Sequence, residues 1–159
     1  MVNRRYKLVA GDLSNTKDVI NYIKNLQFTN GNGANQANIA FSDNRSISAS
    51  STDSLDLAGG LSDVFGNAIT FTEIRGIIVY SDPDNGDTLD IGGAASNGFN
   101  SWVGASGDAV ILRPGGLFVL MATDADGYAV TADTGDLLDI TNNDSGGAAT
   151  YDIIIMGVA

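Results

Sequence analysis

The chain has 159 residues, 43% of them apolar, which is enough for the core of one globular domain and argues against disorder. It contains no histidine and no cysteine, which excludes histidine-based catalytic triads and zinc sites built from imidazole or thiolate. The net charge of −11 argues against a protein that binds nucleic acid or an anionic membrane.

The first 28 residues differ in charge from the rest. They carry five basic residues against two aspartates, a local charge of +3. Residues 29–159 carry three arginines against 17 carboxylates, a local charge of −14. The basic segment could therefore dock on an acidic surface, such as the body of a neighbouring copy. Alternatively, its cations are simply the solvated face of a short helix.

Residues 14–27 predict the one helix of the chain. Ser14 or Asn15 can cap its N-terminus, and four apolar residues follow at helical spacing: Val19, Ile20, Ile23 and Leu26. Residues 29–33 (TNGNG) break this pattern and indicate a flexible linker. We therefore expect residues 1–33 to form a basic arm with one amphipathic helix.

Residues 34–159 predict an acidic all-β body, because short apolar segments alternate with turns rich in Gly, Asn and Asp. The expected strands are residues 38–42, 45–50, 55–57, 69–81, 88–92, 109–113, 117–122, 128–131, 137–142 and 151–158. The run 77–80 (IIVY) is typical of a strand buried on both faces. Residues 109–122 predict a hairpin around Pro114-Gly115-Gly116. About nine or ten strands at this spacing favour a jelly roll or another β-sandwich.

Carboxylates are the plentiful reactive group, and no pair of them stands out as catalytic. Glu73 lies two residues before Arg75, which predicts an ion pair or a solvated pair rather than a glycosidase acid. The turn with Asp82, Asp84 and Asp87 superficially resembles a calcium loop, but Asp and Gly also suit a simple turn. We expect no enzyme activity, no cofactor and no metal, with calcium at this turn as the alternative.

The aromatic residues Phe99 and Trp102 lie in a stretch rich in Gly, Ser and Asn. They could form an exposed contact for a ligand or partner, or they could plug one end of the sandwich. If Trp102 is exposed, it would suit a carbohydrate together with Asp108.

Three stretches carry a resemblance to a known class of protein. They are residues 46–71 (SISASSTDSLDLAGGLSDVFGNAITF) with 73–81, residues 113–120 (RPGGLFVL), and residues 135–140 (GDLLDI) with 151–157 (YDIIIMG). Their turn and strand texture resembles that of small structural proteins of tailed bacteriophages, of the capsid-decoration (cement) or head-fibre type. The resemblance covers residues 36–158 and includes no active-site residues.

The resemblance implies a non-enzymatic protein on the capsid surface of the virion. It would form a homotrimer and bind the major capsid protein or other virion proteins, with many weak contacts adding up. The candidates for anchoring to the capsid or to a neighbouring subunit lie in the arm: Arg4, Arg5, Lys7, Lys17, Val19, Ile23, Lys24 and Leu26. The alternative is a carbohydrate- or receptor-binding module of a tail fibre or adhesin, with Trp102 and Asp108 at its binding site.

Overall fold

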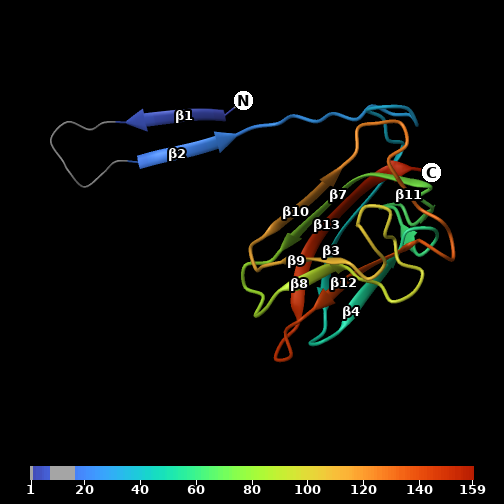
Figure 1. Cartoon of the computed structure of the whole chain (residues 1–159). Coiled ribbons are helices and arrows are strands. Elements are labelled where there is room, and N and C mark those ends of the chain that lie inside the picture. Colours follow the sequence, from blue (N-terminus) through green and yellow to red (C-terminus); the bar gives the residue numbers. More distant parts are fainter. Residues whose placement is uncertain (1, 8–16) are drawn as a thin grey trace.

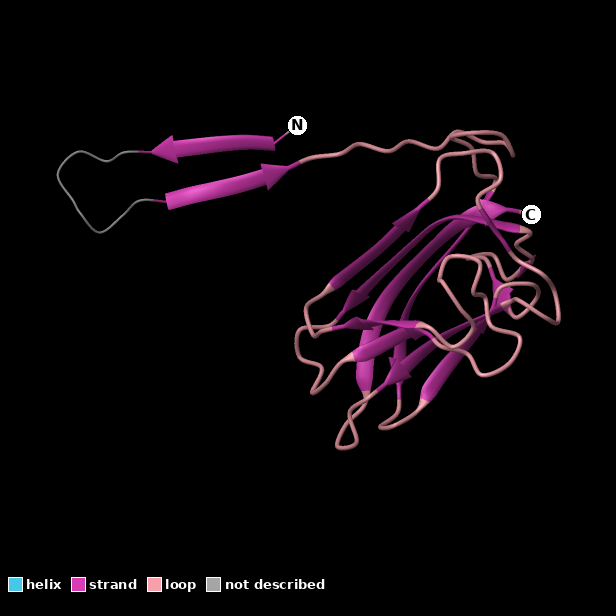
Figure 2. Cartoon of the chain, viewed as in Figure 1, coloured by secondary structure: helices cyan, strands magenta, loops and turns pink. Residues whose placement is uncertain are grey.

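All regular structure in the residues that the structure describes is β-structure (Figure 2), which confirms the all-β prediction. The structure is a computed structural model that describes residues 2–7 and 17–159, with side chains from residue 21 onward. Within these residues there is no helix, and hence none that could span a membrane.

The body consists of two antiparallel sheets and one small hairpin (Figure 1). The five-stranded sheet has the order β10-β7-β13-β3, with β11 also paired to β7. Its strands are β3 (Ile39–Ile47), β7 (Glu73–Ser81), β10 (Leu117–Met121), β11 (Tyr128–Ala129) and β13 (Ala149–Val158). The four-stranded sheet has the order β4-β12-β8-β9, with β4 (Thr52–Asp56), β8 (Leu89–Gly92), β9 (Ala109–Leu112) and β12 (Leu137–Asn142). The small hairpin joins β5 (Leu61–Ser62) to β6 (Ala68–Ile69).

The two sheets pack face to face, as in a β-sandwich, because apolar residues at alternate positions of most of their strands are buried between them. The five-stranded sheet contributes residues such as Ile77, Val79, Ile153 and Ile155, and the four-stranded sheet contributes residues such as Leu89, Ile91, Leu138 and Ile140. This single core explains why strands far apart in the sequence lie side by side.

The strands pair in a nested order along the chain. β3 pairs with β13, β4 with β12, β7 with β10, and β8 with β9. The predicted hairpin of residues 109–122 is therefore wrong, because β9 and β10 belong to different sheets. The turn Pro114-Gly115-Gly116 carries the chain from one sheet to the other, with Gly115 in the left-handed region at φ 71°.

The two strands expected at 38–42 and 45–50 are instead one continuous strand, β3. Asp43 and Asn44, the expected turn, lie opposite Ile153 and Asp152 of β13. The long apolar partner strand supplies backbone hydrogen bonds throughout, and this pairing overrides the turn preference of Asp and Asn.

The prediction of a helix at residues 14–27 is wrong for its described part. β1 (Val2–Lys7) and β2 (Lys17–Tyr22) form an antiparallel hairpin, with Val2 opposite Tyr22 and Lys7 opposite Lys17, and residues 23–28 are extended chain. Residues 14–16 lie outside the described residues. The β-branched Val19 and Ile20 favour a strand, and a lone helix of this length is marginal without a face to pack against. Figure 1 shows the hairpin projecting from one end of the body.

Candidate functional site: an apolar sheet face and the N-terminal arm

The outer face of the five-stranded sheet is apolar over β10, β7 and β13, whereas β3 presents Ala40, Ser42 and Asn44 there. Cross-strand register places its residues in three rows: Leu117, Tyr80 and Asp152; Val119, Ile78 and Ile154; Met121, Gly76 and Met156. We call the seven large apolar members the apolar face: Ile78, Tyr80, Leu117, Val119, Met121, Ile154 and Met156. Leu117 is 61% exposed and Val119 is 52% exposed, so the rows face solvent in the single chain.

Three neighbouring strands make this face because each carries an unbroken apolar run. In β7, Ile77 and Val79 point into the core and are fully buried, whereas Tyr80 is 38% exposed. The expectation that this strand is buried on both faces for part of its length holds for residues 74–77, whereas Ile78 and Tyr80 are partly exposed on the outer side. The runs in β10 and β13 follow the same alternation.

The end of the apolar face away from Asp152 is formed by two methionines beside Gly76. A Cβ atom on Gly76 would lie 2.7 Å from Met121 Sδ and 2.9 Å from Met156 Cε, so the two methionines close over the glycine. Methionine side chains are flexible and polarisable, and they adapt to the shape of a partner.

The outer face of the four-stranded sheet is polar by contrast. The hydroxyls of Thr52 and Thr141 lie 2.8 Å apart, and Ser54 donates a hydrogen bond of 2.6 Å to Asp139. Ile111 is a single exposed apolar residue on this side. The apolar face is thus a property of one sheet rather than of the whole surface, which marks it as an interaction surface.

One end of the apolar face is acidic. Asp152 continues the row of Tyr80 and accepts a hydrogen bond of 2.7 Å from the side-chain amide of Asn44. Asp82 lies beside them, around a small pocket of about 50 Å³. A partner for this surface should therefore combine apolar and basic groups.

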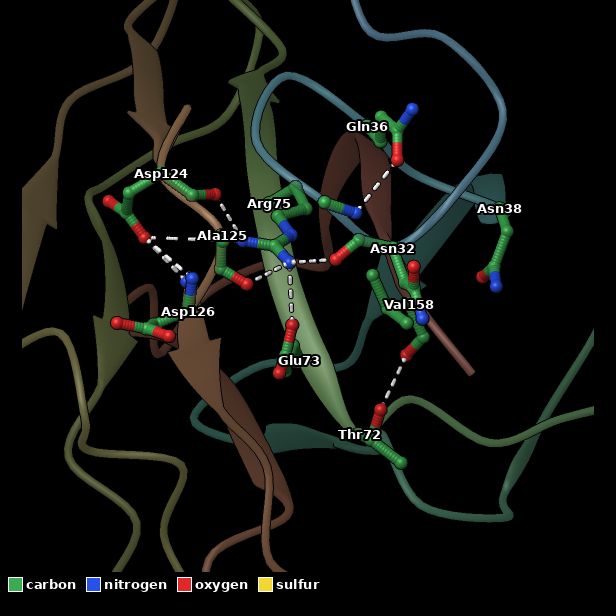
Figure 3. A network of polar contacts seen from close by, with 12 residues as sticks. Asn32, Gln36, Asn38, Thr72, Glu73, Arg75, Asp124, Ala125, Asp126 and Val158 are labelled. Atoms are coloured by element: carbon green, nitrogen blue, oxygen red, sulfur yellow. Dashed lines mark hydrogen bonds and ion pairs between the residues drawn. The ribbon is translucent and has the colours of Figure 1, made fainter.

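The root of the arm is fixed to the body through Arg75 (Figure 3). Arg75 occupies a β-bulge in β7, because Met156 lies opposite Gly76 whereas Gly157 lies opposite Ile74. Its guanidinium is fully buried and donates hydrogen bonds to the backbone carbonyls of three residues in two loops: Asn32, Asp124 and Ala125. Arg75 also pairs with Glu73 Oε2 at 2.7 Å, which confirms the predicted ion pair.

A backbone hydrogen bond adds to this attachment. The N–H of Asn35 donates to the carbonyl of Thr123 at 2.9 Å, two residues after the end of β10. The loop of residues 29–36, which includes the expected linker 29–33, is thus held against the body next to the apolar face. Residues 23–28 are the stretch that joins this fixed loop to the hairpin.

The eight anchoring candidates all lie in the arm. Arg4, Arg5 and Lys7 are in β1, and Lys17 and Val19 are in β2, where the backbone alone is described. Ile23, Lys24 and Leu26 follow in the extended stretch with exposed side chains, next to Tyr22, which is 69% exposed. Whether these residues bind a partner stays a prediction.

A second exposed apolar site lies at the tip of the β5–β6 hairpin, which the sequence reasoning missed. Val64 is 83% exposed and Phe65 is 86% exposed. The backbone N–H groups of Phe65 and Asn67 both donate to Asp63 Oδ1 at 2.8 Å, which holds the turn in one conformation. Large apolar side chains on a fixed tip are suited to contact a partner.

A polar groove of about 450 Å³ runs along β3 and β4, the neighbouring edges of the two sheets. Arg45 forms two hydrogen bonds with the carboxylate of Asp53, of 2.6 and 3.0 Å, and the hydroxyl of Tyr151 donates to Asp53 at 2.8 Å. Burial alone would raise the pKa of Asp53, but the hydrogen bonds from Arg45 and Tyr151 outweigh it and lower this pKa. Arg45 and Tyr151 in the five-stranded sheet thus hydrogen-bond to Asp53 in the four-stranded sheet and link the two sheets.

Of the two interpretations of Phe99 and Trp102, an exposed contact does not fit Phe99, which is 3% exposed and belongs to the core. Trp102 is half-buried, donates from its indole N–H to the carbonyl of Phe99 at 2.9 Å, and packs edge-on against Phe118. The other interpretation, in which Phe99 and Trp102 close one end of the sandwich, fits both residues. Asp108 accepts a hydrogen bond from the N–H of Ala105 and so belongs to a local turn.

The calcium candidates Asp82, Asp84 and Asp87 form an ordinary turn. Asp82 accepts a hydrogen bond of 2.8 Å from the N–H of Asp84, and Asp87 accepts one of 2.7 Å from the N–H of Thr88. In the part of the chain that the structure describes, no three acidic side chains converge to hold a metal ion. The carboxylates of Asp82 and Asp87 instead stabilise the backbone turns that they belong to.

Comparisons with family models, with curated proteins and with solved structures found no match to this chain.

Proposed function

We propose that this protein is a non-enzymatic structural protein on the surface of a tailed-bacteriophage virion, where it decorates or cements the capsid. The observation that carries the proposal is the exposed apolar face on an acidic body that also bears a basic arm. Such a surface is costly to leave in water, and large exposed apolar patches mark sites of protein–protein contact. Its partners are the major capsid protein or other virion proteins, and further copies of itself.

The strand order supports a jelly-roll body. Eight strands in four nested antiparallel pairs, split over two sheets, are the order expected when one long hairpin is rolled up. Jelly rolls recur in viral capsid and lectin domains. The resemblance of residues 36–158 to phage structural proteins points to the first of these, although a fold by itself does not fix a function. Phe99 and Trp102 give no support to a carbohydrate site, because one is buried and the other packs on Phe118.

The physical mechanism is multivalent attachment. The apolar face and the arm hold copies together, and the fixed tip of Val64 and Phe65 contacts the shell from each copy. Several weak contacts made by one oligomer give an effective affinity far above that of each contact alone. This arrangement needs no catalytic group.

The test is the composition of purified particles. Virions from a phage that encodes this chain are separated on a density gradient, and the protein is quantified against the shell subunit by mass spectrometry. We expect a fixed ratio of copies to shell subunits. We also expect this ratio to fall when Val64 and Phe65 are both replaced by Ser, which leaves the core intact. Absence of the wild-type protein from the particles contradicts the proposal.

A further inference from the structure

We infer that the arm of one copy binds the apolar face of a second copy, so that the chains exchange arms. The inference rests on the proposed function, because it names the partner of the same assembly surface. Three independent features carry it: the isolation of the hairpin, its chemical match to the face, and the direction in which it leaves the body.

The hairpin is isolated within its own chain. β1 and β2 form a two-stranded sheet of their own, and Figure 1 shows this sheet projecting away from the body. A two-stranded hairpin is marginally stable at best in water and gains stability when it packs on another surface. The side chains of Tyr22, Ile23 and Leu26 are likewise exposed along the arm. The arm thus needs a surface that its own body does not offer it.

The arm and the apolar face are chemically complementary. The described arm side chains include the apolar Tyr22, Ile23 and Leu26 with the basic Lys24 among them, and residues 1–28 together carry +3. The apolar face ends at Asp152 and Asp82 on a body that carries −14. Two bodies placed face to face would repel each other, whereas a basic arm between them lowers that repulsion.

The fixed root directs the arm toward a neighbour. Arg75 and Thr123 hold residues 32 and 35 at the Met121 end of β10, so the arm leaves the body beside the apolar face. From there residues 23–28, six extended residues, span up to about 20 Å. The hairpin can therefore reach across to a second copy while its root stays in place.

The test uses two full-length variants and a matched control. The face variant carries Val119→Asp and Ile154→Asp, and the arm variant carries Ile23→Asp and Leu26→Asp. The control, Ile111→Asp, makes the same kind of change at a 67% exposed residue outside the apolar face. Circular dichroism verifies folding. If the face variant unfolds, Leu117→Asp replaces it.

Light scattering measures the mass of each sample. We expect the wild type and the control to be oligomers, and each of the two variants to be a monomer. A mixture of the two variants should form a complex of two chains, because one arm and one face remain intact and meet between different molecules.

A monomeric wild type, or variants that stay monomeric when mixed, overturns the inference. An arm variant that keeps the full oligomeric mass also overturns it, because that result shows that the arm does not bind the apolar face and that two apolar faces contact each other directly. The presence of the wild-type protein in purified virions is measured independently of these results, so failure of the inference and failure of the proposed function can be distinguished.

Discussion

Arg75 shows how much a single side chain holds together in this protein. It is fully buried, yet its hydrogen bonds reach the loop at the root of the arm and the loop between β10 and β11. The spacing of Glu73 and Arg75 predicts their ion pair. It does not predict the burial, because the other acceptors are backbone carbonyls about 43 to 50 positions away in the sequence. Backbone acceptors have no signature in the amino-acid sequence.

Replacing Arg75 by Met should therefore cost about 1–3 kcal/mol of unfolding free energy, since three backbone carbonyls and the carboxylate of Glu73 lose a charged donor. Urea unfolding at neutral pH measures this loss. The control is Arg113→Met at an exposed position, which should change the free energy by no more than about 0.5 kcal/mol. Equal effects at the two positions would contradict the role assigned to Arg75.

Asp53 gives the protein a specific sensitivity to acid. Its pKa is lowered in the folded state, so it stabilises the fold at pH values above its unfolded pKa of about 3.9 and this contribution is lost as the pH falls through the folded pKa. The variant Asp53→Asn should be less stable than the wild type at pH 7. The difference should stay constant down to about pH 5, shrink as the pH falls further, and vanish below the folded pKa of Asp53, where both proteins carry an uncharged group. Urea titrations across this range measure it, and a constant difference would contradict the assignment.

At the scale of strands, the sequence predicts where strands lie better than how they pair. The bounds of β12 match the expected segment. β7 lies within the expected segment 69–81, and β13 contains the expected segment 151–158, because long apolar runs mark both strands. The pairing of β9 with β8 instead of β10 could not be predicted, since a Pro-Gly-Gly turn suits both a hairpin and a crossing between sheets. The arm was misread because its apolar residues fit helical spacing while Val19 and Ile20 favour a strand.

The apolar face could have been found from a signal that is present in the sequence. The runs 77–80, 117–121 and 153–156 are each apolar on both sides of a strand. Taken singly, each run indicates a strand buried on both faces. Only the order β10-β7-β13 shows that their outer halves form one continuous surface, and that order follows from pairing across the whole chain.

Two glycines in neighbouring strands of the five-stranded sheet should respond differently to alanine. A Cβ on Gly157 would lie 2.2 Å from the backbone carbonyl of Glu73, whereas one on Gly76 would meet only the ends of two methionines. Gly157→Ala should therefore destabilise the fold by about 1–3 kcal/mol, and Gly76→Ala by clearly less. Thermal and urea unfolding of both variants measure the difference, and equal losses would show that the bulge beside Gly157 yields more easily than expected.

For the whole molecule, the separation of charge into a basic arm and an acidic body makes assembly dependent on salt. If the arm binds a neighbouring body, added NaCl screens the attraction and the dissociation constant should rise. Direct contact between two acidic bodies would have the opposite dependence, because salt screens their repulsion. Sedimentation at several NaCl concentrations measures the sign. Tighter association at high salt would contradict arm exchange.

The central place of β13 in its sheet has a consequence for the order of events during synthesis. β13 is the last described strand to leave the ribosome, yet it lies between β3 and β7, and it is the partner of β3 in that sheet. While the chain is still being translated, the backbone N–H and C=O groups of β3 therefore have no partner strand in this sheet. The five-stranded sheet can close only after residue 158 has emerged, so the apolar face takes shape after the β5–β6 hairpin with its exposed tip has already been synthesised.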